Sequence, residues 1–246
     1  RSVSRGLGDV YKRQMNLFDI LGPVMVGPSS SHTAGAVRIG YISGKLLQDH
    51  VVKAEILLHG SFATTGIGHG TDKALIAGLL GMPPDDIRIP DSFFLAKKDG
   101  MEFSFSTITL KDAHPNTAVL RLTGEHGRKI EVQAASIGGG RILIAKLDGI
   151  EVNFSAEKPT LIVHNVDQPG HVAQVTSMLA EKQVNIATLQ LYRDKRGGYA
   201  VMVIETDQEV PEESVAWLEQ LDGIIKVTYI NAVSYTHLRA HETLSD

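Results

Sequence analysis

A chain of 246 residues that is 43% hydrophobic and 21% charged is long enough for one or two soluble globular domains. Its formal net charge of −4 argues against a nucleic-acid partner, and its apolar runs are too short to cross a membrane. No segment resembles a secretion signal, so we expect a cytoplasmic protein. Cysteine is absent, which excludes disulfides and an iron–sulfur cluster ligated by this chain's own thiolates.

The two ends of the chain, residues 1–14 and 233–246, share no pattern with the rest of the sequence. The first has neither helical nor strand periodicity and stops at Met15, which is typical of a natural start. We therefore expect both ends to be non-native tails and exclude them from the functional reasoning. His237 and His241 have the spacing of a helical metal pair, but we expect no metal site in this chain.

The first half, residues 15–155, has a mixed pattern of helix and strand. Apolar spacing predicts a helix, a strand, a second helix and then a strand-rich segment. These cover residues 34–48, 53–59, 72–80 and 102–152. We expect one mixed α/β domain here.

A short polar stretch, residues 155–159, separates this half from the second, residues 159–232. There the pattern predicts strand, helix, strand, strand, helix and strand. These cover residues 160–166, 171–182, 185–192, 199–205, 211–221 and 224–230. The βαββαβ order is ferredoxin-like, so the fold class is α+β. In the first of these helices, Val172, Val175 and Met178 are expected to share the buried face.

Four stretches carry candidate chemistry, and the first is residues 27–33 (GPSSSHT), before the first helix. Hydroxyl and imidazole groups around a helix N-terminus suit a bound carboxylate, because the free N–H groups and the helix dipole both favour negative charge. A helix cap needs only one such residue. The succession of Ser29, Ser30, Ser31, His32 and Thr33 therefore indicates a binding loop.

The other three stretches are residues 59–72 (HGSFATTGIGHGTD), 114–117 (HPNT) and 136–140 (SIGGG). The stretch 59–72 contains no phosphate-loop motif, so it indicates a polar pocket wall, although a flexible turn and a capped helix would also explain it. HPNT is equally consistent with a simple tight turn. Three successive glycines cost backbone entropy, which indicates close approach to a ligand or a neighbour.

Several common catalytic patterns are absent. The chain has no G-x-S-x-G and no H-E-x-x-H, and its histidines match no common zinc spacing. Acid–base roles for the histidines are therefore favoured over metal ligation.

Together, the four stretches resemble the beta chain of the two-chain, iron–sulfur-dependent L-serine dehydratases. The resemblance covers residues 15–232, and GPSSSHT followed by GHGTD is its most specific part. The second half resembles an ACT domain, an amino-acid-binding regulatory module, on residues 165–170 (NVDQPG) and 185–187 (NIA).

This resemblance implies a lyase that converts L-serine to pyruvate and ammonia. A 4Fe–4S cluster would act as a Lewis acid on the β-hydroxyl, and it would be held by a separate, cysteine-bearing alpha subunit. His32 is the first candidate for the base and His69 the second. The substrate-binding wall would be Ser29, Ser30, Ser31, Thr33, His59, Ser61, Thr71, Asp72, His114, Asn116, Gly138, Gly139 and Gly140.

The resemblance also implies a regulatory site and self-association through the ACT domain. Its ligand-contacting residues would be Asn165, Asp167, Gly170, Asn185 and Ile186. In a purely structural reading, Asp167 caps the helix that follows. Whether the domain binds serine or only dimerises stays open, as do the choice between serine and threonine and the subunit stoichiometry.

One alternative function comes from a different class. The chain also resembles the regulatory region of some phosphoglycerate dehydrogenases, which would make it a non-catalytic allosteric module. The Ser-Ser-Ser-His-Thr loop argues for the enzyme subunit, because a purely regulatory domain does not need it. A third possibility is a structural dimerisation module.

Overall fold

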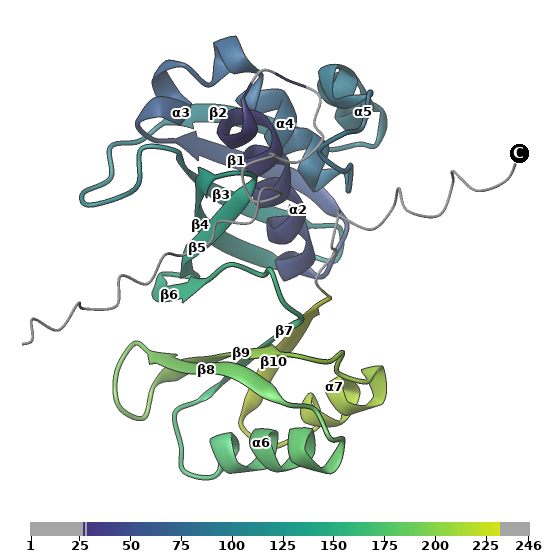
Figure 1. Ribbon diagram of the computed structural model, residues 1–246, viewed down its shortest axis with the longest axis vertical. Coiled ribbons are helices and arrows are strands. Elements are labelled where there is room, and N and C mark those ends of the chain that lie inside the picture. Colours follow the sequence, from purple (N-terminus) through teal and green to yellow (C-terminus); the bar gives the residue numbers. More distant parts are fainter. Residues whose placement is uncertain (1–26, 28, 232–246) are drawn as a thin grey trace, which may run out of the picture.

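The computed structural model describes Gly27 and residues 29–231. Met15, both expected tails and the pair His237 and His241 lie outside this range. Figure 1 shows two stacked parts, with the sheet of the second half lying between its own two helices and the first half.

The first half contains a six-stranded sheet in the order β2-β1-β3-β4-β5-β6. Strands β1 and β2 are parallel, and every other neighbouring pair is antiparallel. The strands are β1 (Val51–Leu58), β2 (Glu102–Thr107), β3 (Thr117–Gly124), β4 (Lys129–Gly138), β5 (Arg141–Leu147) and β6 (Ile150–Phe154).

The helical segments of this half are η1 (Ser30–Gly35), α2 (Ala36–Leu47), α3 (Ser61–Thr64), η2 (Ile67–His69), α4 (Thr71–Leu79), η3 (Ile89–Asp91) and α5 (Ser92–Lys98). Helices α2 and α4 pack against each other at two glycines. A Cβ on Gly40 would lie 2.2 Å from the carbonyl oxygen of Leu75, and one on Gly78 would lie 2.0 Å from that of Val37. The absence of side chains at both positions allows the two backbones to touch.

The second half has the elements β7 (Thr160–Val166), α6 (His171–Glu181), β8 (Ile186–Arg193), β9 (Tyr199–Thr206), α7 (Glu212–Leu218) and β10 (Ile224–Ile230). They form an antiparallel sheet in the order β10-β7-β9-β8, which confirms the ferredoxin-like arrangement. Leu161 and Val163 on one face of β7 pack with Val175 and Leu179 of α6 in a separate small core.

The opposite face of this sheet belongs to the core of the first half. Ile162, Val201, Val203 and Ile230 are buried in the same cluster as the side chains of α2 and α4. Polar contacts join the same surfaces. The Lys226 ammonium donates to the carbonyl of Leu46 at 2.7 Å. The Gln48 amide donates likewise to the carbonyl of Val227, and the Arg38 guanidinium to that of Ala156.

The structure corrects several details of the predicted elements. Helix α5 was not predicted, because seven residues are too few to show a helical period. The helix expected from residue 34 is preceded by the π-helical turn η1. Val172 was expected on the buried face of its helix, but its side chain is 38% exposed. Pro211 precedes α7 as its N-cap residue.

A polar cluster lies at the interface between the two halves. His164 is 2% exposed, and its Nδ1 forms a hydrogen bond with the hydroxyl of Tyr199. Burial, and then the positive charge of Lys226, lowers the pKa of His164 from 6.5 to about 4. Asp148 also faces the cluster, and burial raises the pKa of its carboxyl. Burial and the negative charge of Asp148 together raise the pKa of the Tyr199 hydroxyl to about 12. His164 is therefore neutral in the folded protein at pH 7.

We expect the folded protein to lose stability as the pH falls below neutral. The unfolded chain takes up a proton at His164 below its ordinary pKa of 6.5, whereas the folded chain does so only near 4. The free energy of unfolding should therefore fall between these values, by about 2 kcal/mol from about pH 7 to about pH 5. Urea unfolding at a series of pH values measures this.

The control for this prediction is a variant that cannot titrate. His164→Asn keeps a polar side chain facing Tyr199 and should show a flatter dependence of stability on pH. His50→Asn, at a half-exposed histidine, is the matched control for the same change of residue type. Equal slopes in wild type and His164→Asn would contradict the assignment.

Candidate functional site

His32 is at the centre of a network of hydroxyl groups at the start of η1. Ser29 is the N-cap residue, and its Oγ accepts the main-chain N–H of His32 at 3.2 Å and lies 3.2 Å from Nδ1 of the ring. On the other side of the ring, Nε2 lies 3.2 Å from Ser61 Oγ and 3.3 Å from Thr65 Oγ1. Both imidazole nitrogens therefore have hydroxyl partners.

A second histidine stands beside the first. The ring centroids of His32 and His69 are 4.9 Å apart, and the ring of the buried Phe62 meets His32 edge-on at 5.4 Å. Burial, followed by the nearby charge of His69, lowers the pKa of His32, and a hydrogen bond from Ser61 partly offsets this. At neutral pH the His32 imidazole is therefore unprotonated on one nitrogen, as a base must be.

The four sequence stretches meet in a closed circuit of contacts. The first contacts the second through His32 and Ser61. The second contacts the third because the Ser61 N–H donates to the carbonyl of Pro115 at 2.8 Å. The third contacts the fourth because the Ser136 N–H donates to the carbonyl of Asn116 at 2.9 Å. The circuit closes where Ser136 packs against Gly35, next to the first stretch.

Two glycine positions show how the backbone is shaped here. Gly60 has φ +57, and a Cβ there would lie 2.5 Å from the carbonyl oxygen of Pro115, so only glycine lets these turns meet. At Gly138, Gly139 and Gly140, φ is positive at all three positions, as a tight β4–β5 hairpin requires. No described atom approaches a Cβ at Gly138 or Gly139. The hairpin turn accounts for the backbone conformation of these glycines, and the space around Gly138 and Gly139 is open.

Three hydroxyl groups are buried beneath this network. Thr33, Thr71 and Ser136 are at most 2% exposed, and their oxygens have no hydrogen-bond partner among the described residues. Thr33 lies against Gly27, where a Cβ would be 2.3 Å from its Oγ1. Thr33 and Thr71 therefore lie in the interior behind this network.

The other predicted residues have more local roles in the structure. His59 Nδ1 accepts the N–H of Leu110 at 3.2 Å and so anchors the segment after β2. His114 is exposed, and its Nδ1 accepts the N–H of Asn116. Asp72 accepts the N–H of Lys73 in the first turn of α4. Ser30 and Ser31 are half-buried at the start of η1.

Thr65 was not predicted as a site residue. Its hydroxyl lies 3.1 Å from Ser61 Oγ and contacts His32 Nε2. A signal was available, because residues four apart in a helical turn lie side by side, so a helix starting at Ser61 places Thr65 beside it.

The proposed regulatory residues lie at both ends of the second sheet. Asp167 accepts the N–H of Gly197 at 2.9 Å and pairs with Arg193 at 3.1 Å, and these contacts lower the pKa of its carboxyl. It does not cap α6, whose N-cap residue Gly170 has no side-chain hydrogen bond. Asn165 is buried, and its Oδ1 has no partner among the described residues.

His171 adds to the polar groups at this end. It is 7% exposed, and both of its ring nitrogens lack a partner among the described residues. Nothing in the sequence indicated this buried histidine, because His171 is simply the first residue of the predicted helix.

Asn185 and Ile186 lie at the opposite end. Ile186 at the start of β8 pairs with Thr206 at the end of β9. Arg193, at the other end of β8, pairs with Ala200, and Ala200 pairs in turn with Asn165 of β7. The Asn185 amide donates to Asp207 at 2.6 Å. Within one chain, the five predicted regulatory residues therefore do not meet.

No helix in the described part of the chain is long and apolar enough to cross a membrane. A family model described as serine dehydratase beta chain matches residues 16–99, and one described as ACT domain matches residues 159–223.

Three relatives illustrate the similarity. The probable L-serine dehydratase beta chain of Bacillus subtilis is 40% identical over 215 residues, which cover 87% of this chain and 97% of that protein. The L-serine dehydratase beta chain of Peptoniphilus asaccharolyticus is 39% identical over 196 residues, 79% of this chain and 88% of that one. A D-3-phosphoglycerate dehydrogenase of Methanocaldococcus jannaschii is 28% identical over 200 residues, 80% of this chain but 37% of that protein.

Proposed function

The chain belongs to the family of L-serine dehydratase beta chains, and from that premise we propose that it forms an L-serine dehydratase with a cysteine-bearing alpha subunit. The observation that carries this proposal is the circuit of four stretches around His32. It gathers a neutral imidazole, several hydroxyl groups and a helix N-terminus on one surface. These groups suit a small hydroxylated amino acid.

The residues of this chain do not fit an iron–sulfur cluster of its own. The sequence contains no cysteine, and among the described residues no three His, Asp or Glu side chains are grouped closely enough to hold a metal ion. Thiolates are the usual ligands of a 4Fe–4S cluster. We therefore assign the cluster to the alpha subunit and this chain to the opposite wall of the active site.

His32 is the proposed base. In the tautomer that this role requires, Nδ1–H donates to Ser29 Oγ, and Nε2 carries no proton, so it can take the proton from Cα of serine once the substrate displaces a hydroxyl contact. The β-hydroxyl then leaves as water with the proton that His32 has taken from Cα, and the resulting aminoacrylate hydrolyses to pyruvate and ammonia. Ser61 and Thr65 hold the ring by their contacts with Nε2.

The start of η1 is the proposed site for the substrate carboxylate. Ser30 and Ser31 lie in its first turn, where the main-chain N–H groups of a helix attract negative charge. The buried hydroxyls of Thr33 and Thr71 support the wall behind this turn.

The experiment that tests the proposal is anaerobic co-expression with the alpha subunit, followed by an assay for pyruvate formed from L-serine. We expect activity from the reconstituted pair and none from either chain alone. Activity from the alpha subunit alone, or none from the pair once the cluster is shown spectroscopically to be loaded, would refute it.

Thr65→Ala is expected to lower the turnover of the reconstituted enzyme about tenfold. The change removes a hydroxyl that contacts both His32 and Ser61, and a small misorientation of a catalytic group is costly. The exposed Thr64 offers a matched control, because among the described residues its hydroxyl bonds only to the carbonyl of Gly60. Equal turnover in Thr65→Ala and Thr64→Ala would show that Thr65 does not position the base.

We further propose that the ACT domain self-associates through β8. This strand is at one edge of the sheet, and its outer side pairs with no strand in the described part of the chain. Leu189 and Leu191 on it are 37% and 45% exposed. Antiparallel pairing of two copies would bring Ile186 of one beside Arg193 of the other. Arg193 contacts Asp167, so the predicted regulatory residues would meet between copies.

Leu191→Lys is expected to abolish this association, because a charge on an edge strand opposes pairing. It should also abolish any rise in melting temperature that L-serine produces, since ligand binding to the native state stabilises it. Light scattering and a thermal-shift assay measure the two effects. Ile225→Lys, at a 58% exposed position on the opposite edge strand β10, is the control and should change neither.

The alternative is a non-catalytic regulatory module like the one in phosphoglycerate dehydrogenases. The dehydrogenase match favours it because it spans both halves of this chain. Under this reading L-serine would still raise the melting temperature, but pyruvate formation would not depend on this chain. The reconstitution assay therefore separates the two functions.

A further inference from the structure

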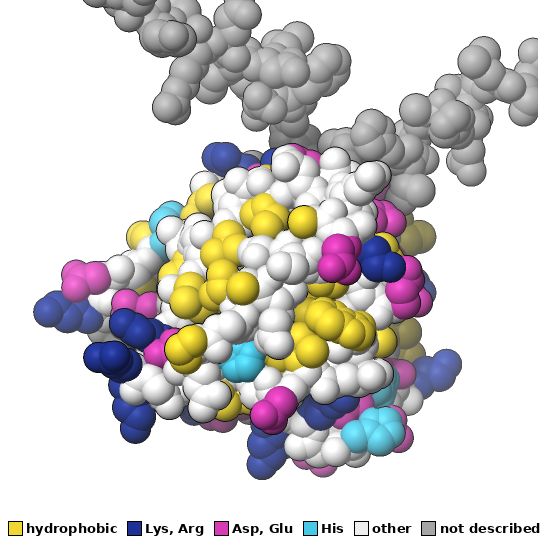
Figure 2. Space-filling model, turned by 90° about the horizontal axis from the view of Figure 1, so that it is seen from below, with side chains coloured by type: hydrophobic (Ala, Val, Ile, Leu, Met, Phe, Trp, Pro, Cys, Tyr) yellow, Lys and Arg dark blue, Asp and Glu magenta, His cyan; other side chains and the backbone are white. Residues whose placement is uncertain are grey.

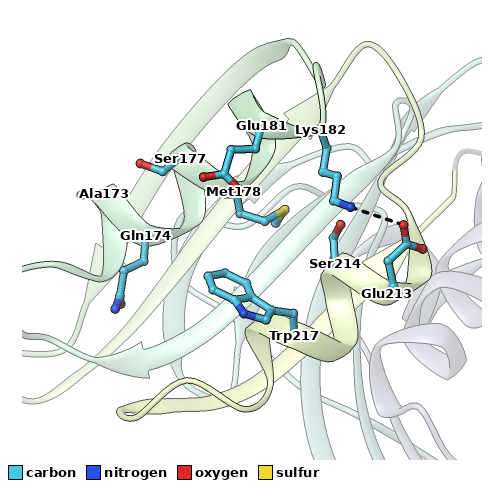
Figure 3. Close-up of a pocket in the computed structure, with 9 residues that line it drawn as sticks. All are labelled: Ala173, Gln174, Ser177, Met178, Glu181, Lys182, Glu213, Ser214 and Trp217. Atoms are coloured by element: carbon cyan, nitrogen blue, oxygen red, sulfur yellow. Dashed lines mark ion pairs between the residues drawn. The ribbon is translucent and has the colours of Figure 1, made fainter.

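A cavity of about 590 Å³ lies between α6 and α7, on the face of the second sheet that points away from the first half. Figure 2 shows this end of the molecule from below, where hydrophobic side chains gather between charged ones. Figure 3 shows that the lining side chains come from both helices. They are Ala173, Gln174, Ser177, Met178, Glu181, Lys182, Glu213, Ser214 and Trp217.

The apolar part of the cavity is built around an indole. Trp217 reaches from α7 toward α6, beneath Met178 (Figure 3). Its side chain is 45% exposed, whereas Met178 is buried. A half-exposed indole face beside a thioether offers a surface for an apolar or a positively charged group.

The charges of the cavity favour a cation. Lys182 pairs with Glu213 at 3.5 Å, so these two charges offset each other. Glu181 forms no ion pair or hydrogen bond among the described residues, and its carboxylate lies near Met178 (Figure 3). One unpaired negative charge therefore remains in the lining of the cavity.

A buried hydroxyl adds an independent sign of a missing partner. Ser214 is 2% exposed, and its Oγ has no hydrogen-bond partner among the described residues. Figure 3 shows this hydroxyl pointing from α7 toward α6. Buried polar groups in folded proteins normally have partners, so a donor or acceptor belongs in this space.

We propose that this cavity binds a small organic amine that has an apolar group and no carboxylate. The ammonium would pair with Glu181, the apolar group would cover Trp217 and Met178, and Ser214 would hydrogen-bond to the bound molecule. The volume lies within the range of about 300–1,000 Å³ that is usual for small-molecule sites. A carboxylate would be repelled by Glu181, which separates this site from the proposed serine sites.

The cavity contains its own reporter, because Trp217 is the only tryptophan of the chain. Tryptophan fluorescence of the full chain is titrated with phenethylamine, and in parallel with 3-phenylpropionic acid and 2-phenylethanol as anionic and neutral analogues. We expect a saturable change with the amine at least about tenfold tighter than with either analogue. Saturating L-serine should not compete.

Two matched variants locate the charge. Glu181→Gln keeps the shape of the side chain and should weaken amine binding about tenfold. Glu212→Gln, at an exposed glutamate of α7 outside the cavity, should leave it unchanged. The proposal is overturned if the three probes bind equally, if phenethylamine causes no saturable change, or if Glu181→Gln binds as wild type. A fluorescence change on dilution of Leu191→Lys, which should not associate through β8, would also overturn it, because a second copy would then occupy the cavity.

Discussion

Replacing His32 by alanine is expected to lower the turnover of the reconstituted enzyme by a factor of about 10²–10⁴, the usual contribution of a positioned acid–base group. The expectation rests on geometry, because both ring nitrogens are held by hydroxyl groups and the imidazole is neutral. The Michaelis constant should change less than the turnover, since the carboxylate is assigned to the start of η1. Steady-state kinetics with L-serine measures both.

The pH profile gives this prediction a second readout. Because the pKa of His32 is lowered, activity should persist as the pH falls through 6.5 and decline only below it. His69→Ala removes the neighbouring charge, so the pKa of His32 should rise and the acidic limb should move to higher pH.

His50→Ala is the control for His32→Ala, because His50 lies just beyond the other end of α2 and pairs with Asp99. It should retain wild-type turnover. Near-normal turnover in His32→Ala would eliminate His32 as the base, and His69 would then be tested in the same way.

Gly40→Ala is expected to destabilise the protein by about 3 kcal/mol, at the upper end of what overpacking a core usually costs. The new Cβ would lie 2.2 Å from the carbonyl oxygen of Leu75 and 3.0 Å from the N–H nitrogen of Leu79. Both are backbone atoms of α4, so no side-chain rotation relieves the clash. Urea unfolding measures the loss.

Gly44 offers a matched control one turn later in the same helix. A Cβ there would lie 3.8 Å from the carbonyl oxygen of Leu79, which is ordinary contact. Gly44→Ala should therefore be neutral or stabilise the protein by up to about 1 kcal/mol, because alanine is the better helix former. If both variants lost the same stability, the close crossing of α2 and α4 would not be the cause.

The sequence was sufficient to predict most elements of the second half. Strands β7 and β10 have the predicted bounds, because each is a short run rich in β-branched residues that follows a Pro or Gly break. Helix α5 was too short to show a helical period, and its first residue makes a contact with a distant part of the chain. The buried Ser92 hydroxyl donates to the carbonyl of Lys73 on α4.

The candidate site was also predictable only in part. The clustering of hydroxyl groups and glycines indicated which four stretches belong together, and the contacts from His32 through Ser136 join them. The separate tasks of the residues depend on partners far along the chain. Nothing near His59 in the sequence shows that its ring anchors Leu110, and nothing near Asp167 shows that it holds Gly197. Such roles arise only from tertiary packing.

The shared core beneath the second sheet has a consequence for how the protein unfolds. Ile162, Val201, Val203 and Ile230 are buried against the first half, so cutting the chain at the polar stretch 155–159 would expose all four on one sheet face. The ACT domain is therefore expected to unfold together with the first half in one cooperative transition, with one free energy of unfolding for both. A ligand of the ACT domain is therefore expected to stabilise the loops around His32 as well.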